Sequence, residues 1–177
     1  MAASFIEVHA GDHVEGPADA PITLVEYGDF ECPQCGHAFA IVQRVRKRMR
    51  GRMRFVFRHF PITSAHPHAQ RAAETAEWAA GEGAFWRMHD RLYTHQQSLD
   101  DQSLLAHARA LGLDPAGLQR AWSAHSTIAH IKEDFLGGIR LGVTGTPAFF
   151  VNGVQHAGGW DEAALTDAAL AASPIGL

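Results

Sequence analysis

The stretch EYGDFECPQCG occupies residues 26–36. It contains the only two cysteines of the chain, Cys32 and Cys35, separated by two residues. The apolar run over residues 22–27 predicts a strand before it, and the pattern that begins at Pro33 predicts a helix after it. This order places the Cys32 sulfur at a helix N-terminus, where unpaired N–H groups and the helix dipole favour a thiolate.

The spacing of the two cysteines indicates redox chemistry. Two thiols this close can form a small disulfide ring and open it again. A structural zinc site needs about four ligands and often a second cysteine pair, which the chain lacks. We therefore expect Cys32 to attack and Cys35 to resolve; two ordinary thiols without a redox role are the alternative.

Composition excludes several functional classes. The formal net charge is −4, and seven of the fifteen basic residues lie between Arg44 and Arg54. No aromatic residues interleave with this run as a base-stacking platform, so it predicts a solvated helix face and no nucleic-acid binding. The chain has no apolar stretch of about 18 residues, which predicts no membrane insertion. Residues 1–11 lack a basic and then apolar leader, so we expect a cytoplasmic protein. In that compartment a lone cysteine pair is more often redox-active than structural. Since the sequence shows no additional N-terminal dimerisation domain, we expect a monomer.

Periodicity and turn residues predict an alternating order of strands and helices. The expected elements are strands over 5–8, 22–28 and 54–60, a helix over 33–50, four or five helices within 64–141, a hairpin of 147–151 and 154–156, and a closing helix over 161–172. A helical segment this long between strands predicts an insertion. The expected division is 1–62 with 142–177 as one α/β domain and 63–141 as an inserted helical subdomain.

Two separated motifs together resemble a known family. Residues 26–36 and the stretch GVTGTP over 142–147 are similar to the DsbA-like branch of the thioredoxin superfamily. The inserted helices and the C-terminal strand–strand–helix order match as well. The resemblance implies an α/β thioredoxin fold, in which a central mixed sheet is flanked by helices and carries an inserted all-helical subdomain.

The same resemblance implies roles for residues around the cysteines. Pro147 matches the family's cis-proline, and Thr146 before it would touch the sulfurs and offer backbone groups to an extended substrate. A strand-starting residue is the alternative for Thr146. Pro33 and Gln34 would contact substrate and tune the redox potential. Since Gln34 supplies only a neutral dipole, we expect a weaker oxidant than relatives with histidine there, and a Cys32 pKa near the middle of the range of about 3.5–7.5.

Two glutamates lie near the cysteines in sequence. By resemblance, Glu26 sits beneath the disulfide and assists proton movement at Cys35, and burial would raise its pKa enough for that task. A solvent-facing edge position is the alternative for Glu26. Glu31 is expected to be exposed and without a catalytic role.

Twelve histidines raise the question of a metal site. His37 has no partner ligands in sequence, His66 and His68 form an isolated pair, and His125 and His130 are five residues apart, which does not match the usual helical ligand spacing. We therefore predict no metal and no cofactor other than the Cys32–Cys35 disulfide. The tryptophans are expected to fill cores, with a ligand groove as the alternative.

The predicted function is thiol–disulfide oxidoreductase, an enzyme that exchanges disulfides with protein or small thiols and needs a redox-recycling partner. Reduction or thiol repair fits a cytoplasmic location better than secretory oxidation. One alternative is a redox sensor or binding module that uses the same cysteine pair. The other is a glutathione-linked isomerase or transferase of the thioredoxin fold, against which the intact Cys-x-x-Cys argues.

Overall fold

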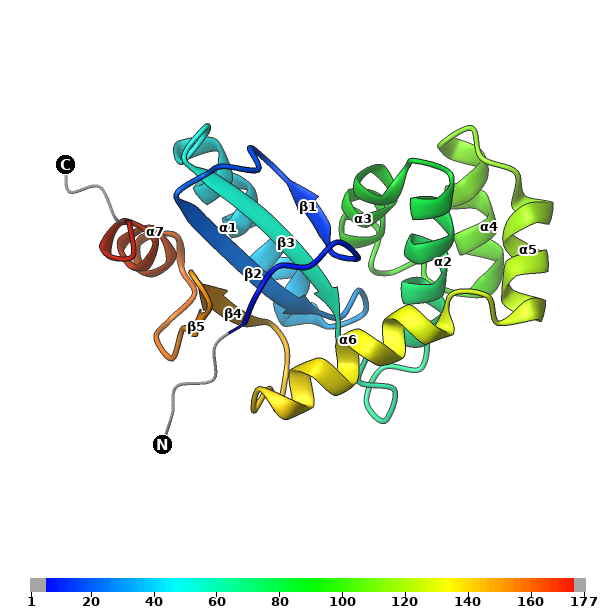
Figure 1. Ribbon diagram of the computed structural model, residues 1–177. Coiled ribbons are helices and arrows are strands. Elements are labelled where there is room, and N and C mark those ends of the chain that lie inside the picture. Colours follow the sequence, from blue (N-terminus) through cyan, green and yellow to red (C-terminus); the bar gives the residue numbers. More distant parts are fainter. Residues whose placement is uncertain (1–5, 174–177) are drawn as a thin grey trace.

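A computed structural model describes residues 6–173, and a five-stranded mixed sheet forms its centre (Figure 1). The strand order is β1-β3-β2-β4-β5. Strand β2 runs parallel to β3 and antiparallel to β4, while β1 and β5 pair antiparallel at the two edges. The strands are β1 (His13–Glu15), β2 (Ile22–Gly28), β3 (Met53–His59), β4 (Ala148–Val151) and β5 (Val154–Gln155).

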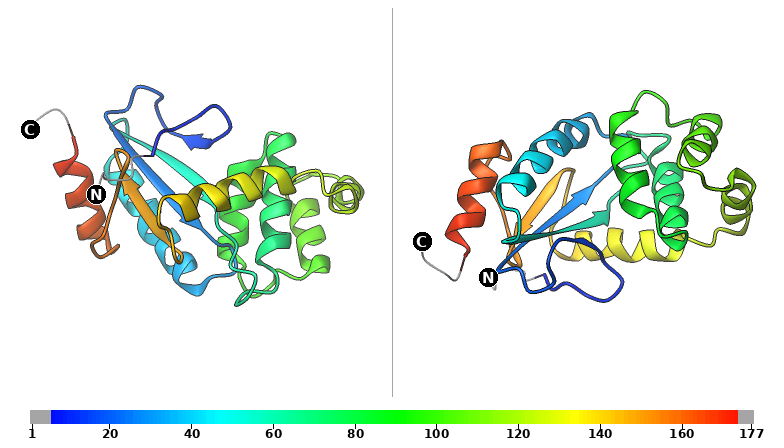
Figure 2. Two further views of the ribbon diagram at one scale, coloured as in Figure 1. Left: turned by 60° about the horizontal axis from the view of Figure 1, so that its bottom comes forward. Right: turned by 90° about the horizontal axis from the view of Figure 1, so that it is seen from above.

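Helices cover both faces of this sheet. Helices α1 (Pro33–Arg48) and α7 (Glu162–Ala171) lie on one face, and α6 (Ile128–Arg140) runs along the other (Figure 2). All seven residues of β2 are buried, because this central strand is covered from both sides. The sheet and its flanking helices confirm the expected fold class.

The segment between β3 and β4 is helical throughout, as expected. Its five helices are α2 (Ala69–Gly81), α3 (Phe85–Thr94), α4 (Asp101–Ala110), α5 (Pro115–Ala124) and α6. Helices α2 to α5 pack beside the sheet, and α6 returns the chain to it (Figure 1). The Asp114 side chain accepts hydrogen bonds from two backbone N–H groups of α5, which confirms the predicted cap before Pro115.

The side chains of β2 point alternately to the two faces of the sheet. Ile22 and Leu24 join the apolar core on the α1 side, whereas Val25 and Tyr27 join a second core on the other side. Because successive strand side chains point to opposite faces, Glu26 points to the α1 side. The central strand therefore directs a carboxyl group toward the layer that contains both cysteines.

The hairpin between β4 and β5 forms where the sequence predicts it. Asn152 and Gly153 have φ angles of 45° and 86°, so both adopt the left-handed conformation that a tight two-residue turn requires. The first strand, in contrast, is predicted in the wrong place. Phe5 lies outside the described residues, and residues 6–8 form no strand. The first strand among the described residues is β1, whose mainly polar residues give no apolar alternation.

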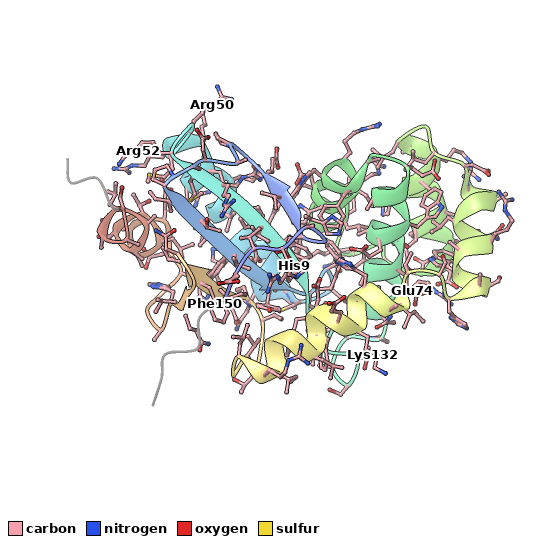
Figure 3. The ribbon with its side chains drawn as sticks, in the orientation of Figure 1. His9, Arg50, Arg52, Glu74, Lys132 and Phe150 are labelled. Carbon is pink, nitrogen blue, oxygen red and sulfur yellow. The ribbon has the colours of Figure 1, made fainter. Side chains whose placement is uncertain are left out.

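The basic run is solvated only in part. Arg50 and Arg52 project outward from the turn between α1 and β3 (Figure 3). Arg46 does not: its guanidinium lies 5.1 Å from the ring centre of Phe55, and it forms an ion pair with Glu15. The prediction of a fully solvated face is therefore wrong for Arg46, because the neighbouring edge strand supplies a carboxylate. In the described part of the chain, no helix is long and apolar enough to cross a membrane.

Candidate active site

Cys32 occupies the N-cap position of α1, and Pro33 begins the helix. The Gly36 backbone N–H donates to the Cys32 carbonyl at 3.1 Å, which closes the first turn. Cys35 lies inside that turn and is fully buried, whereas Cys32 retains 6% exposure. Both are free thiols in the structure. Of the two residues, Cys32, whose thiol is expected to attack, is thus the more exposed.

The two cysteines differ in acidity although they share one helical turn. Hydrogen bonding from the Cys35 thiol, together with backbone N–H groups, outweighs burial and lowers the pKa of Cys32 to about 5. Burial raises the pKa of Cys35 well above its ordinary value of 9.0, and its hydrogen bond to Cys32 adds to this effect. Near neutral pH the pair therefore holds a nucleophilic thiolate at Cys32 and a protonated thiol at Cys35.

Glu26 is a candidate to move the proton of that thiol, because its charge acts on the Cys35 thiol. Its side chain is only 2% exposed, and its Oε1 atom has no hydrogen-bond partner. Burial, with a smaller contribution from the charge of Cys32, raises the pKa of Glu26 from 4.5 to about 8. The alternative of a solvent-facing edge position is wrong, because β2 is a central strand.

The second sequence motif lies directly against Cys32. The Cys32 thiol donates to the Thr146 carbonyl at 3.6 Å, and the Thr146–Pro147 peptide bond is cis. The Thr146 hydroxyl oxygen is buried and has no hydrogen-bond partner while Cys32 is a neutral thiol. The same hydroxyl can donate to a Cys32 thiolate, and this contributes to lowering the pKa of Cys32. More than a hundred residues of chain separate these groups, as the paired motifs predicted.

A surface groove runs beside this motif, with a volume of about 310 Å³. Its lining includes Thr144, Gly145, Pro147, Gln155, His156 and Trp160. Pro33 and Gln34 are both exposed in the first turn of α1, next to Cys32. Trp160 also meets the ring of His37 edge-on, with ring centres 5.5 Å apart. The groove and the exposed dipeptide are accessible surfaces on the two chain segments that meet at Cys32.

Gln96 is a residue of this site that the sequence did not reveal. Its side-chain amide donates to the carbonyls of Phe30 and Cys32, both at 2.8 Å. A Cβ atom at Gly36 would lie 1.9 Å from the Gln96 side-chain oxygen, so glycine leaves the space that Gln96 fills. Gln96 follows α3, and it therefore fixes residues 29–32, here called the cysteine loop, to the helical segment.

Two acidic residues hold the cysteine loop from another direction. Asp29 accepts a hydrogen bond from His66 Nδ1 at 2.7 Å, and Glu31 accepts one from His68 Nδ1 at 2.9 Å. The Glu31 side chain is only 18% exposed, so the expectation that it is exposed is wrong. The pair His66 and His68 supplies the reason, since it brings the segment before α2 against the loop.

Comparison with known proteins agrees with this geometry. Residues 9–170 match a family model described as Thioredoxin. The chain belongs to the thioredoxin family. A thioredoxin-like oxidoreductase from Silicibacter pomeroyi DSS-3 is 31% identical, with a TM-score of 0.81 over 90% of this chain and 91% of that one. This thioredoxin-family chain thus shares its fold and about a third of its sequence with a thioredoxin-like oxidoreductase.

More distant structures share the fold of this thioredoxin-family chain. BdbD from Bacillus subtilis aligns with a TM-score of 0.86 over 96% of both chains, at 20% identity. Alpha-DsbA1 from Wolbachia pipientis aligns with a TM-score of 0.78 over 90% of this chain and 89% of that one, at 22% identity. These likenesses show a DsbA-like fold, as the sequence resemblance implied.

Curated relatives of this chain carry a different name. The Na(+)/H(+) antiporter NhaA 1 of Salinispora arenicola is 45% identical over 161 residues, which are 91% of this chain and 24% of the antiporter. NhaA of Herminiimonas arsenicoxydans is 38% identical over 88% of this chain and 24% of its own length. The chain therefore spans about a quarter of the length of these relatives, and the match concerns that portion alone.

Proposed function

We propose that this protein exchanges disulfides with protein or small thiol substrates through Cys32 and Cys35. The opposed acidity of the two thiols within one helical turn carries this proposal: the pKa of Cys32 is lowered to about 5, and that of Cys35 is raised above its ordinary value. One thiol is thus ready to attack, and its neighbour stays protonated until it is needed.

In the reductive direction the Cys32 thiolate attacks one sulfur of a substrate disulfide. A bond forms between them, and the other substrate sulfur leaves as a thiolate. Ionised Glu26 then takes the proton of Cys35, and the new thiolate attacks Cys32. The mixed disulfide breaks, the second substrate thiolate leaves, and the enzyme retains the Cys32–Cys35 disulfide after passing two electrons to substrate. The reverse sequence oxidises a substrate dithiol, and a separate redox partner restores the starting state.

The surfaces around Cys32 support an extended substrate. The Thr146 carbonyl reaches the sulfur, and the groove beside Pro147 continues away from it. A substrate strand could pair with the backbone there and place its sulfur at Cys32. Exposed Pro33 and Gln34 would contact the other side of the same substrate.

The acidity of Cys32 also sets an expected redox strength. A pKa of about 5 lies between the values of about 7 for thioredoxin and about 3.5 for the strong oxidant DsbA. A more stable thiolate favours the reduced form and makes the disulfide more oxidising. We therefore expect a reduction potential between about −270 and −120 mV.

Equilibration in glutathione buffers, read by thiol alkylation and mass, measures that potential. Turnover is measured separately with a dithiol-coupled disulfide substrate. Cys32→Ser should lower turnover by about 1,000-fold or more, and Cys35→Ser should accumulate a mixed disulfide, because resolution is lost. Glu133→Gln, an exposed substitution on α6 that keeps both sulfurs, serves as the control. Full turnover by Cys32→Ser would overturn the mechanism, and slow turnover with a large oxidation-dependent change in partner binding would favour a redox sensor.

A further inference from the structure

Three histidines and one glutamate converge where the sheet meets the helical segment. His13 comes from β1, His59 from the end of β3, Glu77 from α2 and His130 from α6. Glu77 Oε1 accepts a hydrogen bond from His59 Nε2 at 2.7 Å and another from His13 Nε2. His130 Nε2 lies 3.8 Å from the same oxygen. Three imidazole nitrogens therefore surround one carboxylate oxygen.

This cluster is enclosed by protein. The side chains of His59 and Glu77 are 1% and 9% exposed, and that of His13 is 14% exposed. The Phe85 ring stacks on the His13 ring, with ring centres 3.5 Å apart. Three of the four side chains are thus largely shielded from solvent, while that of His130 is 27% exposed.

Hydrogen bonding within the cluster leaves one nitrogen without a partner. A carboxylate oxygen has two lone pairs, and Glu77 Oε1 uses its two for His13 and His59. The His130 Nε2 atom is buried and has no hydrogen-bond partner. Asp134 Oδ2 is 3.6 Å from that nitrogen and already accepts from the His59 backbone N–H at 2.9 Å. A cation among the four side chains would satisfy the orphaned nitrogen.

A neighbouring acidic group is less suited to a cation. His9, Asp12 and Asp134 also bring one ligand atom each within 4.8 Å of one another, and His9 lies at this same junction (Figure 3). However, the Asp12 carboxylate receives two hydrogen bonds from the Arg58 guanidinium, at 2.7 and 2.8 Å. Arg58 already supplies the positive charge there, whereas the Glu77 cluster contains no such cation.

We propose that His13, His59, Glu77 and His130 bind one zinc ion. Tetrahedral zinc, with bonds of about 2.0–2.1 Å, keeps its ligand atoms about 3.3–3.4 Å apart. The distances from Glu77 Oε1 to His59 Nε2 and His130 Nε2, 2.7 and 3.8 Å, lie on either side of that spacing. The ligand atoms of His13, His59 and Glu77 all lie within 4.8 Å of one another, so these three side chains already cluster as a metal site requires. The His130 ring would move toward them to complete the tetrahedron. Imidazole nitrogens suit zinc, while calcium and magnesium prefer oxygen ligands.

Four protein ligands make this a closed site, which is typical of structural rather than catalytic zinc. The ligands come from two strands and two helices, so the ion would join the sheet to α2 and α6. The His59 ring also contacts Phe30, with ring centres 5.9 Å apart, and Phe30 lies two residues before Cys32. Zinc would thus fix the helical segment at a position that also supports the cysteine loop.

The test uses the full chain with Cys32→Ser and Cys35→Ser, which removes thiol ligands as a source of zinc binding. After treatment with EDTA, zinc alone is titrated by calorimetry, and cobalt is added separately to detect the intense visible absorption of a tetrahedral site. We expect one zinc ion per chain and a rise in melting temperature of about 5–10 °C at a zinc concentration 100-fold above Kd. Calcium at the same concentration should have no such effect.

Variants locate the site. His130→Ala removes a partly exposed ligand that makes no hydrogen bond through Nε2, so it should fold and weaken zinc binding about 100-fold or more. Glu77→Gln should do the same but also removes a buried charge. The matched control is His125→Ala, an exposed histidine outside the cluster, which should bind zinc as the parent does. No zinc binding by the parent, or equal binding by the parent and His130→Ala, would overturn the proposal.

Discussion

Glu26 and Glu77 are both enclosed by protein, yet their acidity shifts in opposite directions. Burial raises the pKa of Glu26 to about 8, and its Oε1 atom has no hydrogen-bond partner. Burial also disfavours the charged form of Glu77, but hydrogen bonds from two histidines hold its pKa below the usual range. Burial alone disfavours a carboxylate, and donors aimed at the charge reverse that effect. Partners, more than depth, therefore decide the charge of each residue.

The difference separates two tasks. A group that accepts and returns a proton needs a pKa near the working pH, and Glu26 beside the cysteines has one. A group that holds elements together benefits from a permanent charge with fixed partners, and Glu77 has two. Glu26 lies within ten residues of both cysteines along the chain, whereas the region around Glu77 combines residues from four separate elements.

Removing the charge of Glu77 should have the largest effect on stability. Glu77→Gln leaves the histidine donors without a charged acceptor, and breaking a buried pair costs about 3–5 kcal/mol. Urea unfolding in EDTA at neutral pH measures this loss in metal-free protein. Because the folded pKa is depressed, the contribution of Glu77 is present above the unfolded value near 4.5 and is lost as pH falls through the folded value.

The control for this variant is Glu82→Gln, an exposed position just after the same helix. It should change the free energy of unfolding by less than about 0.5 kcal/mol. A Glu77→Gln variant as stable as this control would show that the histidine contacts contribute nothing to folding. The contrast between the two buried glutamates would then have no energetic meaning.

Removing the charge of Glu26 should instead slow chemistry. Glu26→Gln cannot take the Cys35 proton, so resolution of the mixed disulfide should slow by about 100-fold. In the parent the resolution rate should rise as pH increases through about 8, where the Glu26 carboxylate forms. Stopped-flow mixing at a series of pH values measures both effects, and the variant should lack this step.

Stability provides a second readout for Glu26. Its folded pKa of about 8 exceeds the ordinary 4.5, so between these values the folded protein binds the extra proton and loses stability as pH rises. The parent should therefore lose up to about 1.4 kcal/mol more per pH unit than Glu26→Gln in that window. Exposed Glu133→Gln is the matched control and should follow the parent. An unchanged pH–rate profile in Glu26→Gln would rule out its role as the proton acceptor.

The smallest expected effect concerns Gln96, which joins the helical segment to the cysteine loop. Gln96→Ala removes two hydrogen bonds to loop carbonyls, at a cost of about 1–2 kcal/mol. Thermal unfolding should show a decrease of about 2–8 °C. The exposed neighbour Gln97→Ala should leave the melting temperature near that of the parent. If Gln96 positions the loop, iodoacetamide reactivity of Cys32 should also change in Gln96→Ala but not in the control.

Sequence patterns predicted the parts of the molecule that depend on neighbours along the chain. The cysteine pair at a helix start, the Asp114 cap and the Asn152–Gly153 turn all involve groups within a few residues of one another. The pairing of the Cys-x-x-Cys with Thr146–Pro147 came from a family resemblance, because no local rule joins such distant segments. The proposed division into two domains remains a prediction.

Residues whose partners come from other elements could not be predicted in the same way. Polar side chains such as Gln96 and Glu31 show no periodic signal that identifies a distant donor or acceptor. The metal prediction depended on ligand spacing along the chain, and Glu77 is 64 residues from His13 and 18 from His59. Those distances close only when a short edge strand, the end of β3 and two helices pack together. Local sequence patterns identified the cysteine pair and the helix that follows it, whereas the charge on each buried glutamate depends on tertiary packing, which supplies or withholds the hydrogen-bond donors.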